Sequence, residues 1–137
     1  METVLFVCWH NSARSQMAEG LLRHYGKNGF KVFSAGIEKS EIRPEAIKVM
    51  SEVGIDISNQ FPKTLERYLD QSFDEVVTVC NSADKACPSF PNAKNRLHWD
   101  CPDPEKVKGT EKEILQAFRD SRDMLKSKIE KELLRPS

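Results

Sequence analysis

A cysteine and an arginine stand six positions apart near the start of the chain, within VLFVCWHNSARSQMAEG at residues 4–20. Cys8 ends an apolar run that is typical of a β-strand, and Arg14 opens a stretch with helical spacing. A loop that leads into a helix N-terminus presents unpaired backbone N–H groups and the positive end of the helix dipole. With the two-point guanidinium of Arg14, this loop predicts a binding site for a tetrahedral oxyanion such as phosphate, sulfate or arsenate.

The same positive field stabilises the thiolate form of Cys8, which makes this sulfur a candidate nucleophile. Ser15 can donate a hydrogen bond to the sulfur, and Asn11 can brace the loop, which Ser12 and Ala13 complete. The predicted loop therefore holds both an anion and a nucleophile. The alternative interpretation is a buried cysteine at a strand end and an arginine on the surface.

The elements that must position this loop alternate along the chain. Apolar or β-branched runs predict strands over residues 3–7, 31–36, 75–80 and 95–99. Helical spacing predicts helices over residues 14–25, 44–53 and 64–69, and Thr110 with Glu113 forms a capping box that opens a long helix. This alternation favours one α/β domain over residues 1–137, with a four-stranded parallel sheet covered by helices on both faces.

The carboxyl ends of parallel strands meet at one edge of a sheet, where ligands bind in such folds. Cys8 ends the first predicted strand, Cys80 ends the third, and DCPDP at residues 100–104 follows the fourth. We therefore expect all three to lie at the same edge.

Composition excludes several classes of protein. Lys plus Arg and Asp plus Glu both number 21, so the net charge is zero and no basic field favours nucleic acid as a partner. No apolar run approaches the roughly 18 residues of a membrane-spanning helix, and no charged segment precedes the first apolar run. We expect a cytoplasmic, monomeric protein without membrane contact.

The stretch CWHNSARS resembles the C-x5-R-[ST] signature of protein tyrosine phosphatases. Its place near the N-terminus and the order of the elements are similar to the low-molecular-weight branch of that family, which has a Rossmann-like fold. The resemblance implies that Cys8 is the nucleophile, Arg14 the oxyanion clamp and Ser15 the support of the thiolate. It also implies that an Asp-Pro pair supplies the general acid, which Asp103 matches; Asp100 is the local alternative.

Two further cysteines favour a reductase over a phosphatase. Cys80 and Cys87 lie in VCNSADKACP, with six residues between them. A second thiolate near Cys8 can resolve a covalent adduct, and a third can take over the bond by thiol–disulfide exchange. Arsenate fits where phosphate does, but As(V) can accept two electrons, and a dithiol supplies two.

Together with VFSAGIE, VGIDIS and LHWDCPDP, these stretches resemble the thioredoxin-coupled arsenate reductases of the low-molecular-weight phosphatase family. The resemblance implies that Cys8 attacks arsenate while Asp103 protonates the departing oxygen. It implies a transient Cys8–Cys80 disulfide, then a Cys80–Cys87 disulfide that thioredoxin reduces. No bound cofactor or metal is implied, and phosphate or sulfate is expected to compete with arsenate.

Three positions depart from the family pattern. Ala13 stands where some members have another cysteine. Lys63 falls where some members supply oxygen ligands to a monovalent cation near the loop, so we do not expect bound potassium. Cys101 has no counterpart in the implied mechanism and is either a bystander or a spare thiol.

Two other functions remain open at the level of the sequence. A protein tyrosine phosphatase would use Cys8, Arg14 and Asp103 and leave Cys80 and Cys87 without a role. A zinc-binding module would use the four ligands Cys80, Cys87, His98 and Cys101, although the spacing of its first pair is looser than in common zinc knuckles.

Overall fold

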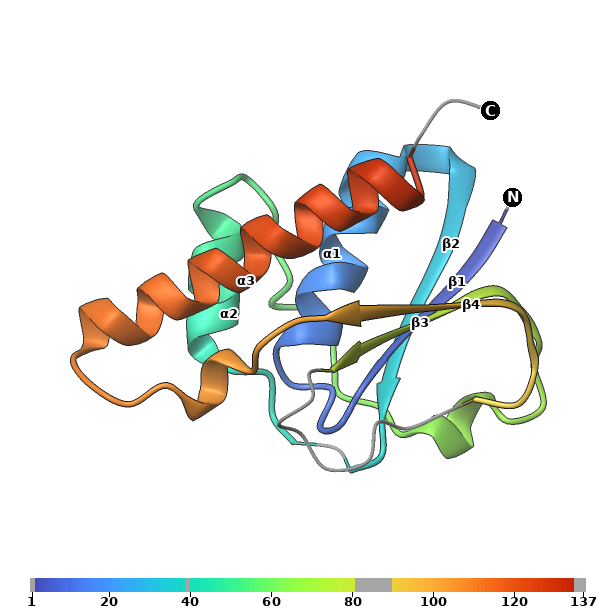
Figure 1. The fold of residues 1–137 in the computed structure, drawn as a ribbon, viewed down its shortest axis with the longest axis horizontal. Coiled ribbons are helices and arrows are strands. Elements are labelled where there is room, and N and C mark those ends of the chain that lie inside the picture. The colour runs from blue at the N-terminus through green and yellow to red at the C-terminus, as the bar shows by residue number, and fades with distance from the viewer. Residues whose placement is uncertain (1, 39, 81–89, 135–137) are drawn as a thin grey trace.

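A four-stranded β-sheet positions the candidate residues. The computed structural model describes residues 2–38, 40–80 and 90–134. The strands are β1 (Glu2–Cys8), β2 (Phe30–Gly36), β3 (Phe73–Cys80) and β4 (Ala93–Asp100). They pair in parallel in the order β2-β1-β3-β4 (Figure 1). The predicted parallel sheet is confirmed, and β1, which carries Cys8, is hydrogen-bonded on both sides.

The helices are α1 (Arg14–Gly26), α2 (Pro44–Ser51) and α3 (Glu111–Glu132), and the 3-10 helices are η1 (Lys27–Gly29), η2 (Leu65–Tyr68) and η3 (Pro104–Lys106). Thr110 and Glu113 form the expected capping box at the start of α3. α2 ends at Ser51, short of the predicted residue 53, and the helix expected over residues 64–69 is the shorter 3-10 helix η2. Among the helices of the described ranges, none is long and apolar enough to cross a bilayer.

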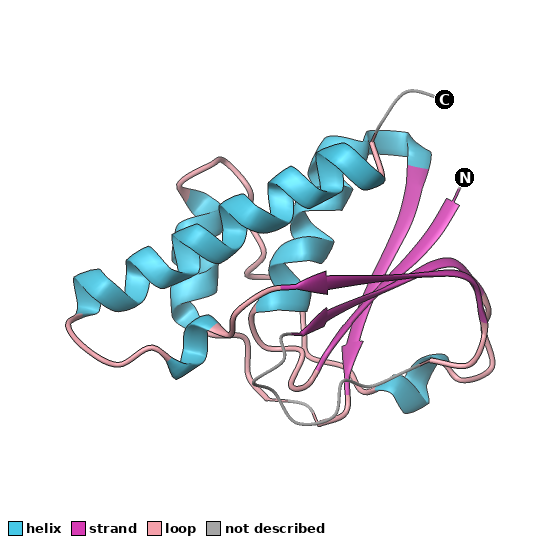
Figure 2. Ribbon diagram, in the orientation of Figure 1, coloured by secondary structure: helices cyan, strands magenta, loops and turns pink. Residues whose placement is uncertain are grey.

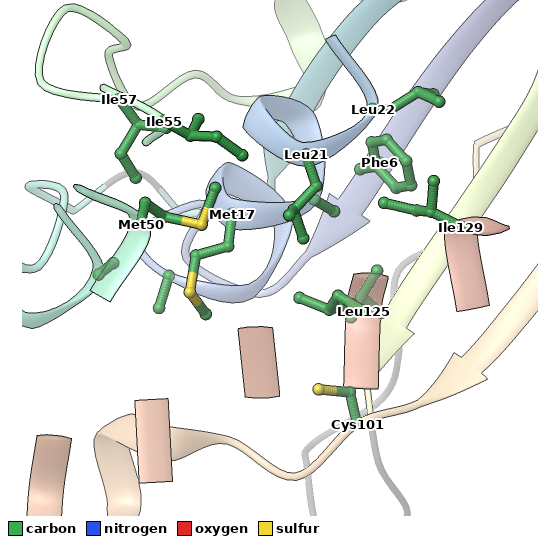
Figure 3. Packing of buried hydrophobic residues seen from close by; sticks show 14 of the residues in the cluster. Phe6, Met17, Leu21, Leu22, Met50, Ile55, Ile57, Cys101, Leu125 and Ile129 are labelled. Atoms are coloured by element: carbon green, nitrogen blue, oxygen red, sulfur yellow. The ribbon is translucent and has the colours of Figure 1, made fainter. Parts of the chain in front are cut away.

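The two faces of the sheet are covered differently. Alternation along β1 sends Val4 and Phe6 to one face, where they pack with residues of all three α-helices. Figure 2 shows the α-helices beside the sheet, and Figure 3 labels Phe6 among the buried residues. Leu5 and Val7 point to the other face, where Tyr68 of η2 joins their cluster. Both faces are thus covered as expected, but within the described residues the second face has a 3-10 helix where the first has α-helices.

The carboxyl ends of the strands lie at one edge, as the sequence predicts. Cys8 pairs with Gly36 at the end of β2, and Cys80 pairs with Asp100 at the end of β4. Val7 pairs with Thr78, so β1 and β3 end at nearly the same level. This register brings Cys8, Cys80 and the segment after β4 to the same edge.

Candidate active site

The loop between β1 and α1 is folded tightly against its neighbours. Asn11 adopts a left-handed backbone with a φ of 56°, which Asn tolerates better than most residues. The carbonyl of Trp9 accepts hydrogen bonds from the N–H groups of Ile37 and Glu38 at 2.8 and 3.0 Å. Gly36 allows this approach, because a Cβ atom there would lie 2.7 Å from the Trp9 oxygen. The loop is therefore a fixed part of the fold.

The Cys8 sulfur is held by two hydrogen-bonding groups. It lies 2.8 Å from Ser15 Oγ, and the N–H of Asn11 donates to it at 3.3 Å. Asn11 Nδ2 also donates to Ser15 Oγ at 2.7 Å, which leaves the serine proton free to point at the sulfur. These two contacts fix the position of the Cys8 sulfur at the start of the loop. The predicted bracing by Asn11 and the predicted contact of Ser15 are both present.

Ser12 and Ala13 complete the loop and are buried. Ala13 is the N-cap residue of α1 and makes no side-chain capping hydrogen bond. Its side chain therefore leaves the N-terminal amide groups of α1 uncapped, which is what an anion site at this position requires.

Arg14 connects this loop to the segment after β4. Its Nη1 donates to the carbonyl oxygen of Cys101 at 2.9 Å, and its Nη2 lies 3.6 Å from Asp103 Oδ2. The guanidinium is buried, with 4% of the residue exposed. Asp100, by contrast, is exposed at the end of β4. Of the two candidate acids, Asp103 is the one that lies against Arg14.

Cys101 is a buried thiol of a different kind. Cys101 is completely buried in the hydrophobic cluster that includes Leu125 and Ile129. Figure 3 labels all three residues. Burial raises the pKa of the Cys101 thiol to about 11, and the nearby charge of Arg14 only partly opposes this. At neutral pH the thiol is protonated and therefore a poor nucleophile.

The second candidate thiol, Cys80, ends β3 and is also buried. It is disulfide-bonded, whereas Cys8 and Cys101 are free. The backbone carbonyl of Cys80 accepts a hydrogen bond from Cys101 N–H at 3.2 Å, which fixes the segment after β4 to the end of β3. Cys87 lies outside the described residues.

Lys63, one of the positions that depart from the family pattern, is buried beside the loop. Its backbone N–H donates to Asn11 Oδ1 at 2.8 Å, and its Nζ lies 3.2 Å from Glu19 Oε1. Ser34 donates to the same carboxylate oxygen. Desolvation lowers the pKa of Lys63, although the charge of Glu19 opposes the shift. This position therefore supplies a buried ammonium group, paired with Glu19, beside the loop.

Sequence reasoning missed three polar residues that hold the site. Gln16 Nε2 donates to both the carbonyl oxygen and Oδ1 of Asn11 at 3.0 Å, Glu19 anchors Lys63, and Glu105 accepts a hydrogen bond from Ser12 Oγ at 2.7 Å. Glu19 carried a usable signal, since it is an acid among the apolar positions of α1. For Glu105 no pattern in the sequence indicated the contact.

The zinc alternative receives no support from the described part of the chain. Within residues 2–38, 40–80 and 90–134, no group of three or more His, Cys, Asp and Glu side chains is placed to hold a metal ion. His98 Nδ1 instead lies 2.9 Å from Thr78 Oγ1 on the neighbouring strand.

A buried thiol begins the loop at residues 8–14 between β1 and α1, which we call the oxyanion loop after its predicted ligand, and this loop stands on a four-stranded parallel sheet. The chain belongs to the low molecular weight phosphotyrosine protein phosphatase family, whose family model matches residues 3–135. The resemblance of the loop to this family is thereby confirmed.

Within this family, the chain is similar to several proteins named arsenate reductase. A protein of Halalkalibacterium halodurans named arsenate reductase is 44% identical over 93% of this chain and 92% of its own length. A solved arsenate reductase in its phosphate-binding state is 35% identical, covers 96% of this chain and 95% of its own, and superposes with a TM-score of 0.82. A thioredoxin-dependent arsenate reductase of Corynebacterium glutamicum is 33% identical over 95% of this chain and 62% of its own, with a TM-score of 0.64.

Proposed function

We propose that this protein is an arsenate reductase, an oxidoreductase that converts arsenate to arsenite with electrons from its own cysteines. One observation carries the proposal. The free thiol of Cys8, held by Ser15 at the start of the oxyanion loop, lies at the same sheet edge as a second cysteine, Cys80. The names of the relatives support arsenate as the substrate, and the phosphate-binding state of one solved relative supports a tetrahedral oxyanion in the loop.

The first step makes a covalent adduct. The Cys8 thiolate attacks arsenic, a sulfur–arsenic bond forms, and one arsenic–oxygen bond breaks. The departing hydroxyl takes a proton from Asp103 and leaves as water. Arg14 binds the remaining oxygens through its planar guanidinium, and the amide groups of the loop bind the rest of the charge.

The next steps reduce arsenic and regenerate the nucleophile. The Cys80 thiolate attacks the Cys8 sulfur, so that a Cys8–Cys80 disulfide forms and the electron pair of the sulfur–arsenic bond stays on arsenic as As(III). Arsenite leaves. The Cys87 thiolate then attacks Cys80, which releases the Cys8 thiolate and gives a Cys80–Cys87 disulfide. A thioredoxin dithiol reduces this disulfide and is itself oxidised.

Two observations support this relay. Cys80 is disulfide-bonded while Cys8 is a free thiol, which agrees with a state in which the nucleophile has been released. The solved relative from Corynebacterium glutamicum is described as thioredoxin-dependent, which supports thioredoxin as the reductant. In this scheme the protein needs no bound cofactor or metal, and it works as a monomer in the cytoplasm of a bacterium.

A phosphatase is the second candidate function, because Cys8, Arg14 and Asp103 are assembled as a phosphatase would need them. Phosphate transfer through Cys8 consumes no thiol, whereas reduction of each arsenate consumes two. Loss of free thiols that depends on arsenate therefore separates the two functions. We expect weak phosphatase activity beside the reduction, since both reactions use the same loop.

The decisive assay couples arsenate to NADPH oxidation through thioredoxin reductase and thioredoxin, with glutathione and glutaredoxin as the alternative reductant. We expect turnover with thioredoxin. Cys8→Ser should abolish it, and Arg14→Lys should be severely impaired because an ammonium group cannot reproduce the two-point grip. Wild-type rates for Arg14→Lys would show that the loop does not bind the oxyanion as proposed.

The other two cysteines should fail at different stages. Cys80→Ser should keep oxyanion binding and phosphatase activity but release no arsenite. Cys87→Ser should complete about one reduction per molecule and stop as the Cys8–Cys80 disulfide, since attack on Cys80 is the step it lacks. Peptide mapping after arsenate treatment identifies the trapped bond. Sustained turnover of Cys87→Ser without that peptide would contradict the relay.

A further inference from the structure

Glu105 joins the oxyanion loop to the segment that carries Asp103. It lies in η3, two residues after Asp103, and its backbone N–H donates to Asp103 Oδ1 at 2.9 Å. Its side chain reaches the other way: Oε2 accepts a hydrogen bond from Ser12 Oγ at 2.7 Å. Main chain and side chain of this one residue thus contact the candidate acid and the candidate anion loop.

The surroundings show that the contact between Ser12 and Glu105 is a built feature. Ser12 is buried, and its carbonyl accepts a hydrogen bond from the N–H of Arg43 at 3.0 Å. Arg43 Nε lies 3.7 Å from Glu105 Oε1 and offsets the carboxylate charge. Only 25% of the Glu105 side chain is exposed. A hydroxyl that donates to a partly buried carboxylate makes a stronger bond than one between neutral groups.

An acid at this place needs a reason, because a negative charge beside an anion site weakens anion binding. Arg14 Nη2 also approaches Asp103 Oδ2 from the loop, at 3.6 Å, which is longer than a normal hydrogen bond. On the proposed function Arg14 also binds the oxyanion, so its guanidinium is shared between the substrate and Asp103. The Ser12–Glu105 bond does not involve the oxyanion and therefore persists.

We propose that Glu105 is a positioning residue that holds the Asp103 carboxyl over the oxyanion loop. The proposal rests on the proposed function in one respect, namely that Asp103 is the proton donor. Glu105 does not touch the substrate. It fixes η3 to Ser12, and through its own N–H it fixes the rotation of the Asp103 side chain.

The structure allows the Glu105 side chain to be tested without loss of the fold. Pro104 is buried and anchors η3 independently of the Glu105 side chain, so Glu105→Ala should fold. Glu105→Gln is the conservative variant, because its amide oxygen can still accept the hydrogen bond from Ser12. Glu130, an exposed acid near the far end of α3, provides the charge-matched control Glu130→Ala.

The measurement is the single-turnover rate of arsenite formation by reduced enzyme at saturating arsenate, together with the arsenate concentration for half-saturation. Glu105→Ala should lower the rate about 10-fold, less than the roughly 10²–10⁴-fold expected when the acid itself is removed. Half-saturation should change less than about twofold, because Arg43 already offsets the Glu105 charge and binding belongs to Arg14 and the loop. Glu105→Gln should recover most of the rate, and Glu130→Ala should match the wild type.

A double-mutant cycle with Asp103→Asn completes the test. If Glu105 acts through Asp103, Glu105→Ala should cause no further loss in the Asp103→Asn background. An equal loss in both backgrounds, or a Glu105→Gln variant as slow as Glu105→Ala, would overturn the proposal while leaving the proposed function intact. A wild-type rate for Asp103→Asn alone would instead overturn the assignment of the acid, and the positioning role of Glu105 with it.

Discussion

The contact between Gly36 and the oxyanion loop offers a sharp test of how rigidly the site is built. A Cβ atom at residue 36 would lie 2.7 Å from Trp9 O, 2.8 Å from Asn11 N and 2.9 Å from the carbonyl carbon of His10. All three are backbone atoms, so no side chain can turn aside. Ordinary contact begins at 3.4 Å, and the Gly36→Ala variant must therefore displace the loop by about 0.7 Å.

Two consequences follow from that displacement. Overpacking of this kind costs about 1–3 kcal/mol of unfolding free energy, which should lower Tm by several degrees. A misplacement near 1 Å in a catalytic site can cost about 10²-fold in rate, so we expect kcat/KM for arsenate to fall about 10- to 100-fold. The loss in activity should exceed what the small loss of stability can explain, because the variant remains folded at assay temperature.

The assay compares kcat/KM for arsenate with the thermal melt of the same protein. Gly29→Ala is the matched control, since nothing lies within 4 Å of a Cβ atom at that position. It should leave both quantities near their wild-type values. A Gly36→Ala protein with wild-type activity and wild-type Tm would refute the reasoning, because it would mean that the loop moves freely without consequence for the chemistry.

Three further predictions address other parts of the molecule. Cys101→Ala should keep thioredoxin-coupled turnover within about twofold, because burial raises the pKa of this thiol to about 11 and leaves it unreactive; NADPH oxidation measures this. Glu19→Gln should lower the unfolding free energy measured in urea by about 3–5 kcal/mol, because it leaves the buried Lys63 ammonium without its carboxylate partner. Lys63→Met should lower it less, because Glu19 keeps its contacts with Arg23 and Ser34. The hydrogen bond from Arg119 lowers the pKa of Glu52 from 4.5 to about 2. The wild-type protein should therefore melt at a higher Tm than Glu52→Gln above pH 4.5, and this difference in Tm should vanish as the pH falls to about 2.

Local patterns were enough to predict the frame of the site. Apolar runs located the four strands, and parallel pairing alone placed Cys8 and Cys80 at one edge. The capping box at Thr110 was read from residue types at a fixed spacing. These features succeed because each depends on a few neighbouring residues and on strand direction, which no distant contact overrides here.

Contacts between distant segments could not be predicted in the same way. Ser12 and Glu105 are 93 positions apart, and Lys63 and Glu19 are 44 apart. Such pairs are set by how loops pack over the sheet edge, and an acid in a loop is most often solvated. The same limit applies to Gly36. The run at residues 31–36 predicted a strand that ends at this glycine, but only the packed loop shows which backbone atoms occupy the space of its missing side chain.

The position of β1 at the centre of the sheet has a kinetic consequence. Cys8 and Cys80 end two paired strands, so their separation is set when the sheet forms and not by diffusion of a loop. Well-oriented groups in such an arrangement behave as if one were present at an effective concentration of about 10⁵ M or more around the other. On the proposed relay, no dissolved thiol at millimolar concentration can compete with Cys80 for the arsenic adduct. The oxidised product should therefore be an internal disulfide, and mixed disulfides with small thiols should not accumulate during turnover.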